Sequence, residues 1–140
     1  MALPDARFDP LYTAMYGAAD NESFPVPAVD LTQIDPEFLR REVSYSTREA
    51  SGTIIVDPAA RYAYLVLESD RALKYGVGVG REEALNFPGE AIIARKAEWP
   101  SWRPTPAMIQ REPGGYGPVK DALPGGAVNP LGPRALYRHH

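Results

Sequence analysis

The sequence predicts a mostly β fold with an extended N-terminal arm and one short helix. Residues 62–67 and 73–79 alternate with a period of two on either side of the polar segment 68–71, which is typical of a β-hairpin. The 140 residues include 15 prolines and 12 glycines, more than average usage, and this favours strands, turns and ordered loops over long helices. A chain of this length forms about one domain with a modest core.

Residues 1–50 are predicted to form the N-terminal arm. Its aromatic residues follow no sustained period, so we expect an extended segment that is ordered only where these rings find a groove; they are Phe8, Tyr12, Tyr16 and Phe24. Further along, Asp35 provides an N-cap carboxylate, Pro36 suits the first helical position and Glu37 puts an acid in the first turn. The one short helix is therefore expected over residues 36–41.

The strands are predicted within the second part of the chain, residues 51–140. Residues 53–57 are rich in β-branched side chains and end at Pro58, which cannot donate to a ladder. Together with the hairpin of residues 62–79 they predict a three-stranded meander. Two further strands are expected, over residues 89–96 and residues 134–137.

Three glycines recur at every second position in the second arm of the hairpin: Gly76, Gly78 and Gly80. A nucleotide-binding fingerprint needs the spacing Gly-x-Gly-x-x-Gly at the start of a helix, and here no long amphipathic helix follows through residues 81–89. Glycines inside a strand more often mark a bulge or a close approach of another segment. We therefore favour the structural role over a phosphate-binding loop.

A segment rich in tryptophan and proline begins the long connection between the last two predicted strands. Trp99, Trp102, Pro104 and Pro106 would offer rigid aromatic faces to an extended peptide or a sugar ring, so they are the candidate substrate-binding residues. The alternative is a small hydrophobic cluster beneath a long loop. We expect the connection, up to residue 132, to be a long loop without secondary structure, and the prolines favour an ordered one.

Composition excludes several classes of site. A formal charge of −3 provides no basic surface for nucleic acid. The absence of cysteine excludes disulfides, thiolate metal sites and a cysteine nucleophile in this sequence. His139 and His140 are the two histidines, and an adjacent pair in a terminal strand chelates a metal poorly. We therefore predict no metal, no cofactor and no catalytic residue, and neither a signal peptide nor a membrane span is recognisable.

Several segments, in this order, resemble the YkuD-type L,D-transpeptidases: TIIVDPAARYAYLVLESDRALKYGVGVGR, GEAIIARKAEWPSWRPTPAMI and LPGGAVNPLGPRALYR. This resemblance implies a β-sandwich or barrel in which residues 51–140 are the front part of the catalytic domain. It implies a protein that binds peptidoglycan stem peptides and acts in the periplasm or cell envelope during cell-wall biogenesis. It also places the tryptophan and proline residues beside the substrate cleft.

The sequence departs from the family's catalytic pattern. Relatives use a cysteine in a Ser-x-Gly-Cys-x-Arg motif and a histidine followed by glycine for acyl transfer, and neither motif occurs here. We therefore expect a truncated member that lacks transpeptidase activity, which leaves open whether the chain is an enzyme. The alternatives are a non-catalytic peptidoglycan-binding or peptide-binding module and a degenerate gene product. Missing strands would also leave an unpaired sheet edge through which copies could associate.

Overall fold

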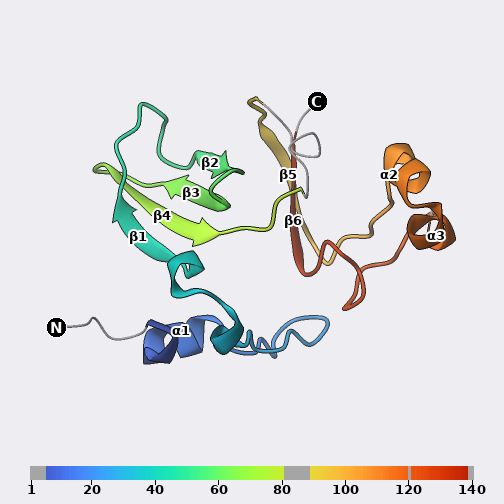
Figure 1. The fold of residues 1–140 in the computed structure, drawn as a ribbon, viewed down its shortest axis with the longest axis horizontal. Coiled ribbons are helices and arrows are strands. Elements are labelled where there is room, and N and C mark those ends of the chain that lie inside the picture. Colours follow the sequence, from blue (N-terminus) through green and yellow to red (C-terminus); the bar gives the residue numbers. More distant parts are fainter. Residues whose placement is uncertain (1–5, 81–88, 120, 139–140) are drawn as a thin grey trace. The chain divides into compact units, whose positions relative to one another are not determined.

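Antiparallel strands dominate the computed structural model, which describes residues 6–80, 89–119 and 121–138 (Figure 1). The predicted mostly β fold is confirmed, because the strands form two antiparallel sheets and the helices are short. The chain divides into two compact units. Unit 1 contains Met1–Gly17 and Val29–Pro88, and unit 2 contains Ala18–Ala28 and Gly89–His140. The predicted domain boundary at residue 51 stays a prediction.

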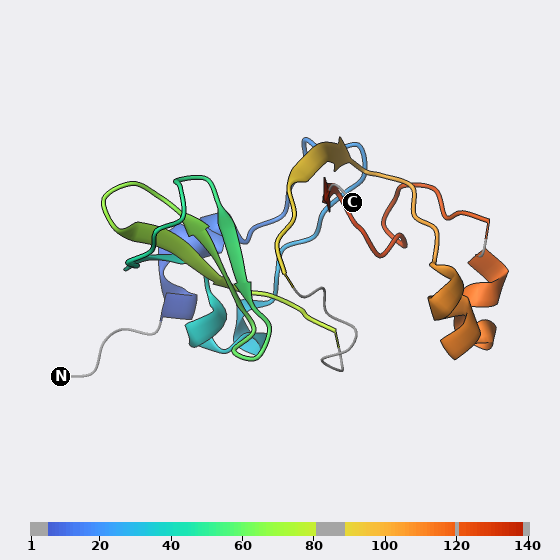
Figure 2. The same ribbon diagram turned by 90° about the horizontal axis from the view of Figure 1, so that it is seen from above.

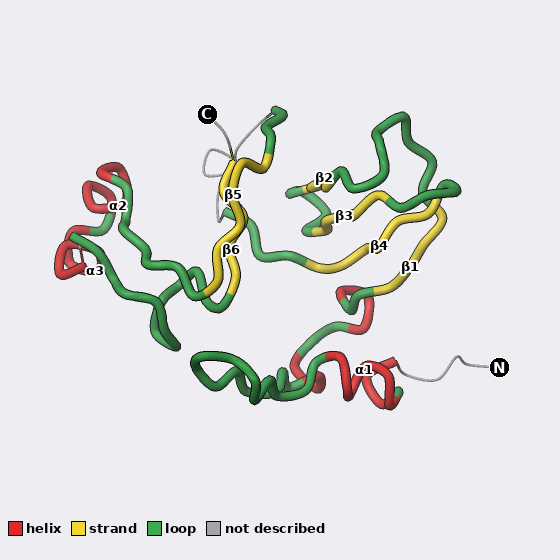
Figure 3. The backbone as a smooth tube through the Cα atoms, turned by 180° about the vertical axis from the view of Figure 1, so that it is seen from behind, coloured by secondary structure: helices red, strands yellow, loops and turns green. Residues whose placement is uncertain are grey.

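Unit 1 is built around a four-stranded sheet with the order β1-β4-β3-β2. Its strands are β1 (Arg41–Ser44), β2 (Ile54–Asp57), β3 (Tyr62–Val66) and β4 (Arg71–Gly76). The meander of β2, β3 and β4 is confirmed, and β4 ends at Gly76 instead of continuing to residue 79. Figure 3 shows these strands in yellow. The core of this unit contains Leu39, Ala63, Val66 and Ala72.

The hairpin turn lies where the polar segment predicted it. Leu67 N–H donates to the carbonyl of Arg71 at 2.9 Å and closes the turn between β3 and β4. Ser69 and Asp70 both have positive φ, 60° and 55°. Positive φ at successive turn residues matches the twist of the two strands, and aspartate tolerates this conformation better than most residues.

The N-terminal arm contains helices within residues 6–15, where the sequence predicted an extended segment. The described residues begin with η1 (Ala6–Phe8) and α1 (Pro10–Met15), and the N-cap carboxylate of Asp9 accepts from Leu11 N–H at 2.8 Å. The expectation of an extended arm was therefore wrong here. Two tyrosines hold α1 to the segment before β1, because Tyr12 O–H donates to Arg40 O at 2.6 Å and Arg40 N–H donates to Tyr16 Oη at 2.9 Å.

The helix predicted over residues 36–41 begins as expected but is shorter. Asp35 caps η3 (Pro36–Phe38), which is a single 3-10 turn, and η2 (Leu31–Gln33) precedes it. The prediction did not include β1, whose pairing with β4 draws the chain into a strand from Arg41 onward. Residues without a sustained helical period take the conformation that tertiary pairing imposes.

Gly76 makes the close backbone approach that the strand glycines suggested. A Cβ at this position would lie 2.5 Å from the Cβ of Phe38, whereas a Cβ at Gly78 would meet nothing within 4 Å. We expect Gly76→Ala to lower the free energy of unfolding by about 1–2 kcal/mol, because the Phe38 Cβ lies too near its backbone to move aside. Gly78→Ala is the matched control and should leave stability nearly unchanged. Urea unfolding of both variants checks this, and equal stabilities would contradict it.

The described part of unit 2 contains a two-stranded sheet, two short α-helices and one 3-10 turn. Its elements are β5 (Ile93–Glu98), α2 (Pro106–Arg111), α3 (Pro113–Tyr116), η5 (Gly117–Val119) and β6 (Arg134–Arg138). Both predicted strands are present, with β5 starting later than expected, and β5 pairs with β6 in antiparallel fashion. The connection between them was expected to lack secondary structure, and this was wrong, because α2 and α3 lie within it (Figure 2).

Some expectations fall on residues that the structure does not describe. They concern the absence of a helix after the glycine repeat, within residues 81–88, and the terminal pair His139 and His140. Among the described residues, no helix has both the length and the apolar character that crossing a bilayer requires.

Candidate functional site

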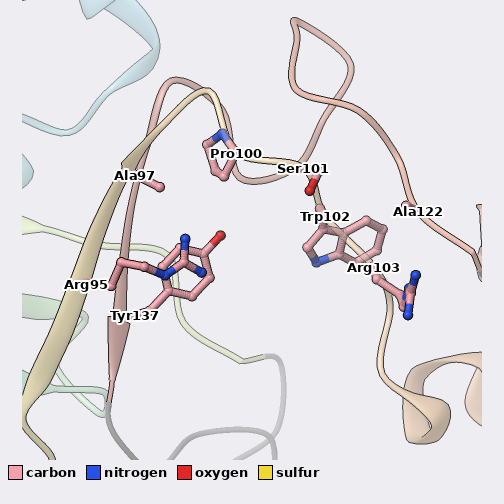
Figure 4. A pocket seen from close by; sticks show the side chains of 8 residues that line it. All are labelled: Arg95, Ala97, Pro100, Ser101, Trp102, Arg103, Ala122 and Tyr137. Carbon is pink, nitrogen blue, oxygen red and sulfur yellow. The ribbon is translucent and has the colours of Figure 1, made fainter.

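A pocket of about 410 Å³ lies within unit 2, beside the β5–β6 sheet (Figure 4). Strand side chains form one wall, and the loop after β5 forms the other. The lining residues are Arg95, Ala97, Pro100, Ser101, Trp102, Arg103, Ala122 and Tyr137.

The strand wall presents a stacked arginine. Arg95 and Tyr137 are direct cross-strand partners, and the Arg95 guanidinium carbon lies 3.9 Å from the centre of the Tyr137 ring. A register irregularity between Ile93 and Arg95 creates this pairing, because it shifts β5 by one residue against β6. The planar guanidinium keeps its N–H groups available at its edge while its face contacts the ring.

The loop wall presents an indole and a second arginine. Trp102 exchanges two main-chain hydrogen bonds with Leu123, at 2.8 and 2.6 Å, and its ring meets Tyr116 of α3 edge to face at 5.9 Å. Arg103 donates from Nε to the carbonyl of Asp121 at 2.7 Å. Backbone and ring contacts thus orient both side chains before any ligand arrives.

Asn129 connects the two segments that form the loop wall. Its side chain is 4% exposed. The amide Nδ2 donates to the carbonyls of Pro100 and Leu123 at 3.0 Å and of Pro124 at 3.1 Å, and Oδ1 accepts from Leu131 N–H at 2.9 Å. One buried amide therefore hydrogen-bonds to main-chain groups in three segments of the connection, at residue 100, residues 123–124 and residue 131.

Trp99 lies outside the pocket lining and anchors residues 18–28 within unit 2. Its indole N–H donates to Glu22 Oε2 at 3.0 Å, and its ring meets Phe24 edge to face at 4.9 Å. Arg134 donates to both carboxylate oxygens of Glu22, at 3.1 and 2.7 Å. The hydrogen bonds from Arg134 first, and then from Trp99, lower the pKa of the Glu22 carboxyl below its usual value.

The four candidate substrate-binding residues have different surroundings. Trp102 lines the pocket, and Trp99 packs against Phe24. Pro104 is buried, and Pro106 occupies the first turn of α2. The structure does not test whether any of them binds a substrate. Pro104 and Pro106 are outside the pocket lining, so the structure brings together only Trp102 from this set with the pocket.

Sequence reasoning missed the residues that give the pocket its chemistry. Arg95 lies in the strand that was expected to end at residue 96, and Ala97 shares its face only because β5 continues to Glu98. No local sequence pattern indicated that Tyr137, about forty positions later, pairs with Arg95. Asn129 precedes Pro130, a dipeptide that favours turns, but no local pattern indicated that its amide would donate to Pro100 O, 29 positions earlier.

The lining residues can bind and orient a ligand. They offer two guanidinium groups, one indole, one phenol and one hydroxyl, and they include no carboxylate, imidazole or thiol. Neither guanidinium contacts a carboxylate within the described part of the chain. Nor do the described residues include three or more histidine, cysteine, aspartate or glutamate side chains grouped to hold a metal ion. The arrangement suits recognition of an anion with an apolar body.

Comparison with known proteins gives one informative match. No protein-family model and no curated protein matches the chain. A solved structure of a probable carnitine operon oxidoreductase CaiA from Brucella melitensis matches with a TM-score of 0.65 and 43% sequence identity. The match covers 79% of this chain and 68% of the Brucella chain.

This match overturns the family expected from the sequence. The Brucella protein is described as an oxidoreductase and not as an L,D-transpeptidase. The expected membership of the L,D-transpeptidases was therefore wrong, and so were the functions in peptidoglycan cross-linking and cell-wall biogenesis that it implied. The order of a few scaffold segments had carried that resemblance, and a scaffold does not determine chemistry.

Proposed function

Because the chain belongs to the family of the Brucella melitensis protein described as a probable carnitine operon oxidoreductase, we propose that it has an oxidoreductase function whose substrate is a small carboxylate held in the unit 2 pocket. The observation that carries this proposal is the pair Arg95 and Arg103, which both line the pocket without a carboxylate partner among the described residues. Arginine matches the geometry of a carboxylate through paired N–H donors.

The charge balance supports an anionic ligand. The chain has a formal charge of −3, yet the ionisable groups that give the lining its charge at neutral pH are the two arginines. A local positive potential in a negatively charged protein selects anions over cations. Tyr137 and Trp102 add aromatic surface for the apolar part of the ligand.

Carnitine is an instructive test compound because it carries a carboxylate and a quaternary ammonium. Aromatic faces attract quaternary ammonium groups. In this pocket, however, the Arg95 guanidinium covers one face of Tyr137, and a second cation there would be repelled. We therefore expect the carboxylate to provide the recognition and the ammonium to add little.

The substrate-binding residues expected from the sequence enter this proposal with separate roles. Trp102 would contact the ligand directly. Trp99 would support the site from outside the pocket, since its indole holds Glu22. Pro104 and Pro106 would fix the path of the loop that leaves the pocket and enters α2.

Titration of the purified chain with 3-hydroxybutyrate, carnitine and choline tests the proposal. Calorimetry and tryptophan fluorescence should both show saturable binding of 3-hydroxybutyrate, carnitine binding no more tightly, and no binding of choline. At least one of the variants Arg95→Gln and Arg103→Gln should weaken 3-hydroxybutyrate about tenfold, the value of one charge-assisted contact at an open site.

Arg111→Gln is the matched control, because it removes the same charge from unit 2 at a position outside the lining. It should leave affinity unchanged. Absence of saturable binding for both carboxylates, or equal binding in both pocket variants and the parent chain, would contradict the proposal.

We also propose that copies of the chain associate through the outer edge of β2, which pairs with no further strand among the described residues. Val56 is 53% exposed, and the strand has no charged residue before Asp57. The opposite edge strand, β1, instead carries two charged residues, Arg41 and Glu42, which disfavour edge-to-edge pairing. Sedimentation at increasing concentration measures this, and a single monomeric species throughout would contradict it.

A further inference from the structure

We propose that the pocket selects a dicarboxylate, with one carboxylate on Arg95 and the other on Arg103. This inference rests on the proposed binding of a carboxylate and goes further, because it specifies how many anionic groups the ligand carries. The ligand class is an open-chain dicarboxylate with a short apolar middle.

The two arginines approach the pocket from different walls. Arg95 belongs to β5 and is held against Tyr137, whereas Arg103 belongs to the loop after β5 and is held by Asp121 (Figure 4). In this view the side chains of Arg95 and Tyr137 lie on one side of the pocket, and those of Trp102 and Arg103 lie on the other. Because the two guanidiniums belong to different walls, we expect each of them to bind a carboxylate of its own.

Each guanidinium is already oriented and still has donors to offer. Stacking on Tyr137 fixes the plane of Arg95 and uses its face instead of its N–H groups. The bond from Nε to the Asp121 carbonyl fixes Arg103 and leaves Nη1 and Nη2 for a ligand. Orientation before binding reduces the entropy that a contact costs, which favours a ligand that uses both groups.

The space between the walls suits a short chain of methylene groups. The volume of about 410 Å³ falls at the small end of ligand pockets and accommodates a molecule of a few carbon atoms. Trp102 and Pro100 give the lining apolar surface in this region. A polar middle would gain less from these contacts than an apolar one.

A comparison of dicarboxylates with monocarboxylates of the same chain length tests the inference. Calorimetry on the whole chain measures succinate, glutarate and adipate against butyrate, pentanoate and hexanoate. At least one dicarboxylate should bind about tenfold more tightly than its monocarboxylate partner, because it gains a second charge-assisted contact. In Arg95→Gln and in Arg103→Gln that advantage should fall to about twofold or less, the statistical factor for two identical ends.

The outcomes separate this inference from the proposed function. Equal affinity for both ligand series overturns the dicarboxylate inference while carboxylate binding stands. Failure of both series to bind overturns both. Inorganic phosphate binding as tightly as the best dicarboxylate also overturns the inference, because one compact anion would then suffice. Thermal melts of the two exposed-arginine variants should match the parent chain, and this shows that a lost advantage reflects lost contacts.

Discussion

Asn129→Leu is expected to destabilise unit 2 by about 3–5 kcal/mol, because leucine has the same branched shape but no hydrogen-bonding groups. The substitution would leave the carbonyls of Pro100, Leu123 and Pro124 and the N–H of Leu131 without their present partner. Each buried polar group left unpaired costs about 1–3 kcal/mol, and these groups lie at partly buried positions. Since domains are stable by about 5–15 kcal/mol, this loss is a large fraction.

Urea unfolding followed by tryptophan fluorescence measures this effect, because Trp99 and Trp102 both belong to unit 2. Asn21→Leu is the matched control, since Asn21 is exposed in the same unit. Unfolding midpoints that shift equally in the two variants would show that the hydrogen bonds of the buried amide do not stabilise unit 2.

Asn129→Asp separates hydrogen bonding from packing. Aspartate has nearly the same shape, but at neutral pH its carboxylate would face three carbonyl oxygens and repel them. Burial beside three carbonyl oxygens, with Leu131 N–H as a donor to one oxygen, raises the pKa of such a carboxyl. The protonated form regains one O–H donor, so it should partly restore stability as the pH falls. The parent chain has no ionisable group at this position and should show no such recovery.

The strands were predictable because their signal is local. Alternation of apolar side chains in residues 62–67 and 73–79 requires no knowledge of partners, and the structure has β3 and β4 there. The pocket was not predictable for the opposite reason. It depends on the register that pairs Arg95 with Tyr137 across a one-residue irregularity, and no local pattern fixes a register between distant strands.

Two missed helices carried the same signal as the one that was predicted. Asp9 and Pro10 start α1 in the way that Asp35 and Pro36 start η3, and Thr105 accepts from Met108 N–H at 3.2 Å to cap α2. These capping signals were present in the sequence and could have predicted α1 and α2. The helix α3 could not have been predicted in this way, because its sequence Pro-Gly-Gly-Tyr has poor helix propensity. Packing of Tyr116 against Trp102 stabilises it instead.

Gly125→Ala is expected to destabilise unit 2 by at least about 3 kcal/mol, above the usual cost of overpacking. A Cβ at this position would overlap the carbonyl oxygen of Trp99, lie 2.9 Å from its carbonyl carbon and lie 3.4 Å from Pro100 O. A clash with a flexible side-chain tip could be relieved by a rotamer change. This clash is with main chain, so relief requires two backbone segments to separate.

The backbone at Trp99 has little freedom to yield. Its N–H donates to Pro133 O at 2.8 Å, its indole is held by Glu22, and its φ of 44° already lies in a region that a bulky residue rarely adopts. Moving the Trp99 carbonyl would therefore disturb the start of the loop wall. Gly114→Ala is the control, because a Cβ there meets nothing within 4 Å and alanine favours the helix of α3. Urea unfolding should show a large loss for Gly125→Ala and none for Gly114→Ala. A Gly125→Ala chain as stable as the parent would mean that Trp99 can move, and that the loop wall is not set before a ligand binds.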